Sequence, residues 1–270
     1  MPYDKKVSRA EPGLICLALD DSGSQGDKLP GTSDPKYQWV ERYVGIILKE
    51  LLSRSTDSNG DRVRIKPRYH IHTIIYGSHP SVWGQGVMDI QATVEKYAND
   101  GNSLGLRGNH GGTDGAAAMQ QTLDFLKQAV NDPKFQQSFP PMVFHLTDGM
   151  SDSDPSQIAE QIKQLTTADG NVLVVNAFIG TQTSLSYQGP DDFPGYVDAD
   201  EAGPNTDNII MFNMSSPMPA VIRQNLIDDG IFPNLRPGAR LFFDVRTKEM
   251  LKHVIQVVGS LGSRAERQVR

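Results

Sequence analysis

The sequence predicts an α/β fold, in which helices flank a doubly wound and mostly parallel central sheet. Three mainly apolar runs, Leu14–Leu19, Pro141–Leu146 and Val172–Ile179, have the composition of strands that are buried on both faces. Between them lie two long helical stretches, Tyr37–Arg54 and Ala116–Val130. Strands that alternate with helices are typical of parallel sheets whose two faces are covered by crossover helices.

The remaining elements continue this alternation along the chain. We expect a strand within Val63–Tyr76, a short strand at Val82–Val87, helices at Ile90–Ala98, Pro155–Leu165 and Ala220–Ile227, a last strand at Arg240–Val245 and a closing helix at Lys248–Val258. Asp57–Asp61 has the composition of a turn. The pattern of Asn208–Met214 fits a strand or a helical turn, and both stay open.

The length of 270 residues is enough for one sizeable hydrophobic core. We predict a single domain over residues 13–260, preceded by an N-terminal segment at 1–12 and followed by a basic tail at 261–270. An acidic loop insertion is expected at 180–207, because the stretch from Gly189 to Asp207 holds several acids and no Lys or Arg. No internal repeat or linker divides the chain.

Composition narrows the class of partner and the cellular location. The formal net charge of −6 argues against nucleic acid or an anionic membrane as the main partner. No apolar run approaches the ~20 residues of a membrane span, and residues 1–11 are too polar for a secretory signal. The single cysteine, Cys16, lies inside the first apolar run and is expected in the core. A cytoplasmic location fits best, while a secreted form without disulfides stays open.

Polar side chains follow the predicted strands where two of them end. Asp20, Ser22 and Ser24 occupy every second position after the first apolar run, and Asp148 follows the second run. Between these segments, Thr113 precedes a predicted helix. Because ligands of doubly wound sheets bind at the carboxyl ends of the strands, we expect these groups at one edge of the sheet. Two carboxylates and several hydroxyls would suit a hard divalent cation there.

This pattern resembles the metal-ion-dependent adhesion site (MIDAS) of von Willebrand factor A (vWA) domains in order, spacing and flanking element types. The resemblance covers most of residues 13–260 and is specific around Asp20, Ser22, Ser24, Thr113 and Asp148. It implies a Rossmann-like vWA fold with an intact MIDAS. It also implies that the three hydroxyls coordinate Mg²⁺ and that the two aspartates supply charge, often through water.

The resemblance further implies a metal-dependent protein-binding module that is not an enzyme. Two carboxylates neutralise a divalent ion but leave an octahedral shell incomplete, so a position stays open for a Glu or Asp carboxylate of a partner protein. Mg²⁺ is expected, with Mn²⁺ or Ca²⁺ as alternatives, whereas Zn²⁺ would require His or Cys ligands. Free-standing intracellular members resemble bacterial signalling or stress-response adaptors, such as those of the tellurium-resistance type.

A metal-dependent hydrolase is the alternative function. Leu17–Ser22 resembles the start of a haloacid-dehalogenase-type phosphatase, in which Asp20 would act as the nucleophile. That chemistry needs a second Asp two positions later as the general acid, and Ser22 stands there instead. The binding interpretation is therefore preferred.

Three features around the site also allow more than one interpretation. Asp27 stands where some relatives place a ligand for a second metal, although Lys28 rather than another acid follows it. The acidic insertion is either a solvated loop or a tethered competitor that offers its own carboxylate to the metal. His110 and Asp114 are expected to shape the loop around Thr113 rather than to bind the metal.

Overall fold

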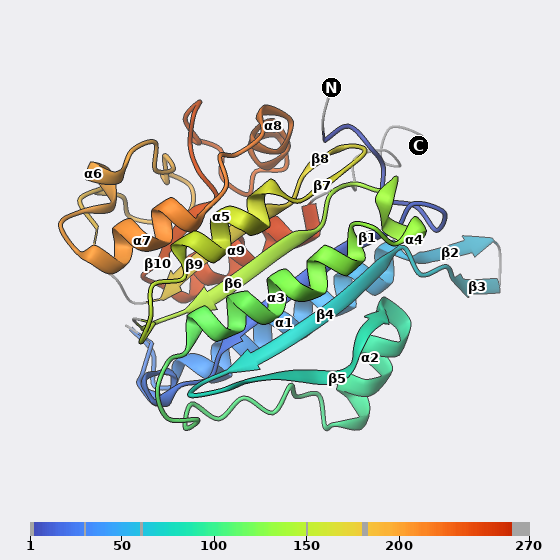
Figure 1. Cartoon of the computed structure of the whole chain (residues 1–270), viewed down its shortest axis with the longest axis horizontal. Helices are drawn as coiled ribbons and strands as arrows, with labels where there is room; N and C mark the ends of the chain where they lie inside the picture. Colours follow the sequence, from blue (N-terminus) through green and yellow to red (C-terminus); the bar gives the residue numbers. More distant parts are fainter. Residues whose placement is uncertain (1–2, 30, 60–61, 150, 180–182, 261–270) are drawn as a thin grey trace.

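The central sheet has six strands and is parallel except at one edge (Figure 1). A computed structural model describes residues 3–29, 31–59, 62–149, 151–179 and 183–260. The strands lie in the order β10-β9-β6-β1-β4-β5. Their bounds are β1 Gly13–Asp20, β4 Tyr69–Tyr76, β5 Pro80–Asp89, β6 Met142–Thr147, β9 Leu173–Ile179 and β10 Phe242–Val245. Only β5 runs antiparallel to its neighbour, so the predicted doubly wound α/β fold is confirmed.

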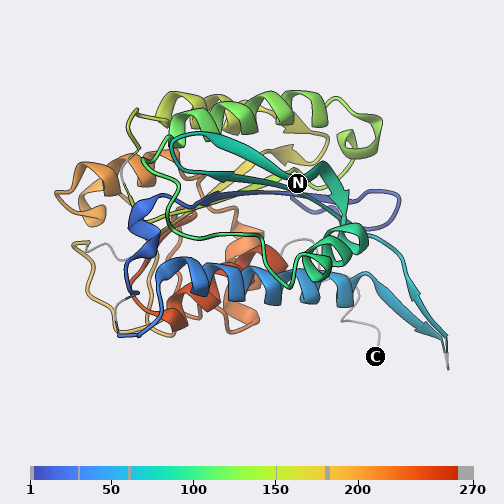
Figure 2. The ribbon, with the colours of Figure 1, turned by 90° about the horizontal axis from the view of Figure 1, so that it is seen from below.

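Helices cover both faces of this sheet (Figure 2). On one face α1 (Lys36–Arg54) packs against α9 (Lys248–Ser260), and on the other α3 (Gly115–Ala129) packs against α5 (Ser156–Gln164). The shorter helices are η1 (Gly23–Gly26), α2 (Ile90–Asn99), α4 (Pro133–Gln136), α6 (Ala199–Ala202), α7 (Thr206–Met214) and α8 (Ala220–Asp228). Two hairpins complete the described elements: β2 (Thr56–Asn59) with β3 (Arg62–Ile65), and β7 (Thr166–Thr167) with β8 (Gly170–Asn171).

β1 occupies the centre of the sheet, between β4 and β6. Its eight residues are all buried, because strands flank both of its edges and helices cover both of its faces. This double burial explains why the strand is apolar almost throughout instead of alternating between apolar and polar residues. Cys16 is only 1% exposed there, and burial raises the pKa of its thiol. Cys16 is therefore a core residue, as predicted.

The order of the strands reverses at β1. From β1 the chain passes through α1 to β4 on one side, and it later passes through α3 to β6 on the other side. The pairing of Leu19 with Leu146 places the carboxyl ends of β1 and β6 next to each other. This is the point of a doubly wound sheet at which ligands characteristically bind.

Two local predictions need correction or completion. Asp57–Asp61, predicted as a turn, begins within strand β2, while residues 60–61 lie outside the described part of the chain. The carboxylate of Asp57 lies 2.5 Å from Lys66 Nζ and 2.8 Å from an Arg68 nitrogen, so these ion pairs join β2 to the segment between β3 and β4. Asn208–Met214, left open between strand and helix, belongs to helix α7.

The central position of β1 leads to a prediction about thiol reactivity. Cys16 is the one cysteine of the chain, so the reaction of the protein with a thiol reagent reports on this strand alone. We expect labelling in native buffer to be slower by several orders of magnitude than in denaturant, because a buried thiol of raised pKa reacts only after the strand opens. Comparable rates in the two conditions would contradict the central placement of β1.

Candidate metal site

The loop that leaves β1 is held by its first side chain. Asp20 is fully buried, and its Oδ1 accepts a hydrogen bond of 2.8 Å from the backbone N–H of Ser22. Its Oδ2 accepts a hydrogen bond of 2.5 Å from the hydroxyl of Thr147, the last residue of β6. Asp20 therefore closes the turn after β1 and joins that turn to the neighbouring strand.

The two serines and the second aspartate meet directly beyond this turn. The hydroxyls of Ser22 and Ser24 are hydrogen-bonded to each other at 3.2 Å. The Ser24 hydroxyl also donates to Oδ1 of Asp148 at 2.7 Å. The structure thus brings together the polar groups that were predicted after β1 and β6.

Thr113 reaches the same place from the loop before α3. A Cβ built on Gly149 would stand 3.4 Å from the hydroxyl oxygen of Thr113 and 3.5 Å from that of Ser24. The two hydroxyls therefore lie on the same side of Gly149, next to the space that its missing side chain leaves open. Asp114 caps α3 by accepting a hydrogen bond of 2.9 Å from Ala117 N–H, so its predicted role in shaping this loop is confirmed.

Asp21 was not predicted as a site residue, yet it holds the Thr113 loop in place. Its Oδ1 accepts the backbone N–H groups of Arg107 and Gly108 at 2.7 and 2.5 Å, and its Oδ2 lies 2.7 Å from His110 Nδ1. Gly108 has a φ of +61°, and a Cβ there would stand 2.7 Å from the backbone of Gln25. A glycine is needed at this position because the two loops meet backbone to backbone.

Lys36 is the second residue that the sequence analysis missed. It is the first residue of α1, and its Nζ lies 2.5 Å from Oδ2 of Asp148 and 3.4 Å from the carbonyl oxygen of Ser24. The side chain of Lys36 is 12% exposed and that of Asp148 is fully buried. A lysine is electrostatically disfavoured at a helix N-terminus, so its position there could have signalled a nearby anion.

Gln25 completes the surroundings of Asp148. Its Nε2 donates to Asp148 Oδ1 at 3.0 Å, while its Oε1 is buried without a hydrogen-bond partner among the described residues. Buried amide oxygens normally have a partner, because an unpaired one costs about 1–3 kcal/mol. The side-chain amide of Gln25 therefore presents a spare oxygen acceptor beside Asp148.

These donors fit a hard divalent cation. No group of three or more His, Cys, Asp or Glu side chains in the described residues is arranged to hold a metal, so an ion here would depend on hydroxyl oxygens. Two carboxylates with the hydroxyls of Ser22, Ser24 and Thr113 form an oxygen-only set, which Mg²⁺ prefers. The ammonium of Lys36 against Asp148 indicates that the position accepts a positive charge.

Burial also makes the charge of Asp20 unfavourable. Desolvation raises the pKa of this carboxyl, while hydrogen bonds from Thr147 and Ser22 act in the opposite direction and the nearby charge of Asp148 raises the pKa further. A cation at the site would offset this cost by stabilising the ionised form.

A series of hydrogen-bonded polar side chains leads from the site into the core. Tyr76 pairs with Asp20 across β4 and β1, and its hydroxyl lies 2.6 Å from His145 Nε2. His145 Nδ1 lies 2.8 Å from Asn176 Oδ1, and the amide of Asn176 donates in turn to Ser215 Oγ. Burial lowers the pKa of His145 to about 4, so the ring is neutral, with its proton on Nδ1 and Nε2 accepting from Tyr76.

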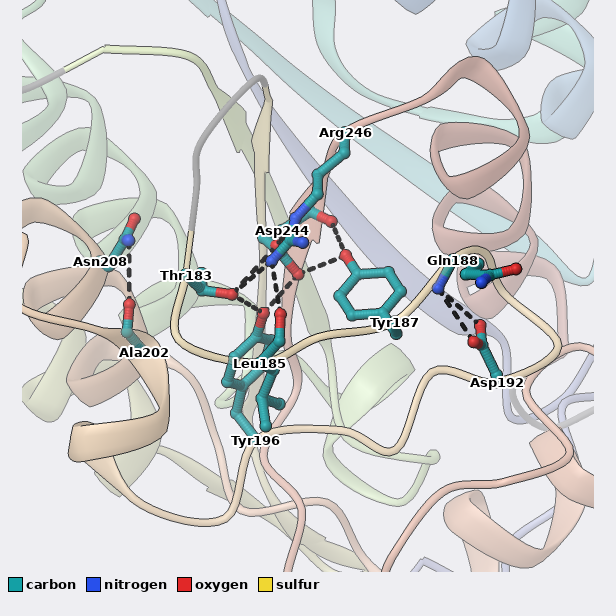
Figure 3. Close-up of polar contacts among 10 residues, drawn as sticks. All are labelled: Thr183, Leu185, Tyr187, Gln188, Asp192, Tyr196, Ala202, Asn208, Asp244 and Arg246. Carbon is teal, nitrogen blue, oxygen red and sulfur yellow. Dashed lines mark hydrogen bonds and ion pairs between the residues drawn. The ribbon is translucent and has the colours of Figure 1, made fainter.

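The acidic insertion is attached to the sheet through one buried carboxylate (Figure 3). Asp244, in β10, is fully buried and accepts hydrogen bonds from the hydroxyls of Tyr187 and Tyr196 at 2.5 and 2.6 Å. Arg246 Nε lies 2.6 Å from its other oxygen. The described part of the insertion is therefore tied down by residues that come much later in the sequence.

Several acids of the insertion have structural roles. Asp192 accepts the backbone N–H groups of Gln188 and Gly189, and Asp198 caps α6. Glu201 lies 2.7 Å from Arg236, which supplies a positive charge that the insertion itself lacks. Three of the six acids between Gly189 and Asp207 thus already have hydrogen-bond or ion-pair partners within the protein. This weakens the hypothesis that the insertion competes for the metal.

No protein-family model matches the sequence, and comparison with curated proteins finds no match. Among solved structures, the chain is similar to the pilus adhesin SpaC from Lactobacillus rhamnosus GG, with TM-score 0.57 and 14% identity, over 95% of this chain and 31% of that one. It is similar to the PilB minor pilin (D319A mutant) from Streptococcus sanguinis, with TM-score 0.50 and 9% identity, over 92% of this chain and 60% of that one. A further match is von Willebrand factor type A from Catenulispora acidiphila, with TM-score 0.42 and 14% identity, over 62% of this chain and 33% of that one.

This chain thus spans less than two thirds of each of these three proteins. At such low identities the likeness to SpaC and PilB concerns the fold alone. It agrees with the doubly wound sheet described above.

The raised pKa of Asp20 gives a testable pH dependence. A carboxyl whose folded-state pKa is raised contributes most to stability below its ordinary pKa, and this contribution is lost as the pH rises through the folded-state value. In EDTA we therefore expect the melting temperature of Asp20→Asn, measured relative to that of the wild type, to rise as the pH is raised from 4 to 7.5.

Asp124→Asn serves as the control for this experiment, because Asp124 is 60% exposed on α3 and should show no such trend. A loss of melting temperature in Asp20→Asn that is the same at every pH would contradict the assignment.

Proposed function

We propose that this chain is a vWA-type domain that binds a protein partner through a divalent metal ion. The observation that carries the proposal is the meeting of Asp20, Ser22, Ser24, Thr113 and Asp148 at the carboxyl ends of β1 and β6. These residues come from three distant segments and follow the order and spacing of the MIDAS pattern, which supports the proposal. A chance polar turn after β1 would not explain the position of Thr113 or of Asp148.

The chemistry follows from the number and kind of the oxygen donors. The hydroxyls of Ser22, Ser24 and Thr113 would hold Mg²⁺ or Mn²⁺, while Asp20 and Asp148 would balance its charge. A bound ion would supply an open, electron-poor coordination position for a carboxylate oxygen. We therefore propose a partner that presents a Glu or Asp side chain.

A hydrolase that uses Asp20 is less well supported. Both oxygens of Asp20 accept hydrogen bonds, from Ser22 N–H and from the Thr147 hydroxyl, and these bonds lower the nucleophilicity of the carboxylate. The position of the required general acid is occupied by Ser22. The absence of catalysis stays a prediction, which a phosphatase assay with Mg²⁺ would check.

The location and pathway are the less constrained part of the proposal. The sequence favours a cytoplasmic adaptor, and the tellurium-resistance-type role rests on resemblance alone. SpaC is a pilus adhesin and PilB a minor pilin, so proteins that share this fold also serve outside the cell. Among the described residues no helix has both the length and the hydropathy that a bilayer span requires.

Mg²⁺ should stabilise the folded protein. A ligand that binds only the native state adds RT ln(1 + [L]/Kd) to the free energy of unfolding, or ~2.7 kcal/mol at a hundredfold excess over Kd. We expect the wild type to melt at a higher temperature in excess Mg²⁺ than in EDTA, and Asp148→Asn to lose this shift.

Asp27→Asn is the matched control, because Asp27 is an exposed acid close to the same loop. It should keep the full shift in melting temperature, whereas loss of the shift in this variant would favour a second metal at Asp27. An Asp148→Asn protein that responds to Mg²⁺ as strongly as the wild type would exclude the proposed site.

A further inference from the structure

We infer that Lys36 is a built-in cation of this site, which neutralises Asp148 in the metal-free protein and must leave it when a divalent ion binds. The inference rests on the proposed function, since it concerns the same site. It adds a residue that the MIDAS pattern does not contain. It also predicts that the free energy of Mg²⁺ binding is reduced by an internal competitor.

The position of Lys36 is set by the backbone as well as by its side chain. Its N–H donates to the carbonyl of Asp27 at 2.9 Å, which fixes the start of α1 against the loop that follows η1. From there the side chain reaches Oδ2 of Asp148 at 2.5 Å and the carbonyl of Ser24 at 3.4 Å. The ammonium therefore lies against a predicted metal ligand and beside the backbone of another.

The burial of this ion pair separates it from ordinary surface pairs. Lys36 and Asp148 have side chains that are 12% and 0% exposed, whereas those of Lys96 and Asp100 are 33% and 38% exposed. Exposed pairs contribute little, but a buried charge that loses its counter-ion is strongly destabilising. Asp148 would be such an uncompensated charge if neither Lys36 nor a metal were present.

A divalent ion and the ammonium would compete for Asp148. Its Oδ1 already accepts hydrogen bonds from Ser24 and Gln25. A new cation would therefore bind Oδ2, which is paired with Lys36. A divalent ion and the Lys36 ammonium at the same carboxylate would repel each other strongly, because both are shielded from water. Metal binding at Asp148 is therefore coupled to departure of the Lys36 side chain.

The size of the effect follows from the population that is able to bind. If Lys36 occupies Asp148 in about 90% of molecules, the apparent affinity for a metal that requires its departure falls about tenfold. Removing the ammonium should restore this affinity. Keeping a positive charge with arginine should not.

The experiment is a calorimetric titration of Mg²⁺ into wild type, Lys36→Met, Lys36→Arg and Lys49→Met. At that occupancy we expect Lys36→Met to bind Mg²⁺ about tenfold more tightly than wild type, and Lys36→Arg to bind no more tightly than wild type. Lys49 is an exposed lysine about 20 Å further along α1, so Lys49→Met removes the same charge from the same helix and should change nothing.

A second measurement needs no variant and so does not depend on the folding of Lys36→Met. The reactivity of single lysines toward an acylating reagent can be followed in the wild type by mass spectrometry. Acylation of Lys36 should rise severalfold in saturating Mg²⁺, while that of Lys49 stays constant.

The possible outcomes distinguish the role of Lys36 from the existence of the metal site. Equal Mg²⁺ affinities in wild type and Lys36→Met, or Lys36 acylation that does not change with Mg²⁺, would overturn the role of Lys36 and leave the metal site standing. If neither wild type nor Lys36→Met binds Mg²⁺, the proposed function itself fails, and the inference fails with it.

Discussion

The burial of two carboxylates at one edge of the sheet is the constraint on which this site depends. Asp20 and Asp148 have fully buried side chains, and a buried carboxylate is stable only when hydrogen bonds or a positive charge replace its water. Hydrogen bonds from Ser22 and Thr147 serve Asp20, while Ser24, Gln25 and Lys36 serve Asp148. Each of these compensating groups is also near the position proposed for a metal ion.

The fold places these groups through two kinds of contact. The reversal of strand order at β1 brings the ends of β1 and β6 together, although the two strands are far apart in the sequence. Asp21 then holds the Thr113 loop by accepting the backbone N–H groups of Arg107 and Gly108. The sheet topology thus brings the two aspartates together, and the hydrogen bonds of Asp21 position the loop that carries the hydroxyl of Thr113.

Much of this arrangement could be predicted from the sequence, because buried strands leave long apolar runs and the polar groups that end them stand out. The roles of Gln25 and Asp21 could not, since no local pattern tells which way a side chain leaves a loop. A lysine at the start of a helix signals a nearby anion, but the sequence does not show that this anion is Asp148. The sequence also did not show that the acidic insertion is held against the sheet, because that depends on Asp244 and Arg236, which follow later in the chain. Helix α7 stayed undecided because its residues are apolar on more than one side.

The most direct test of the central claim is to locate the metal. Crystals grown or soaked with Mn²⁺ should show one anomalous scattering peak among the oxygens of Ser22, Ser24, Thr113, Asp20 and Asp148, with the Lys36 ammonium no longer against Asp148. Well-diffracting crystals at saturating Mn²⁺ that show no peak there, with Lys36 still bound to Asp148, would contradict the account.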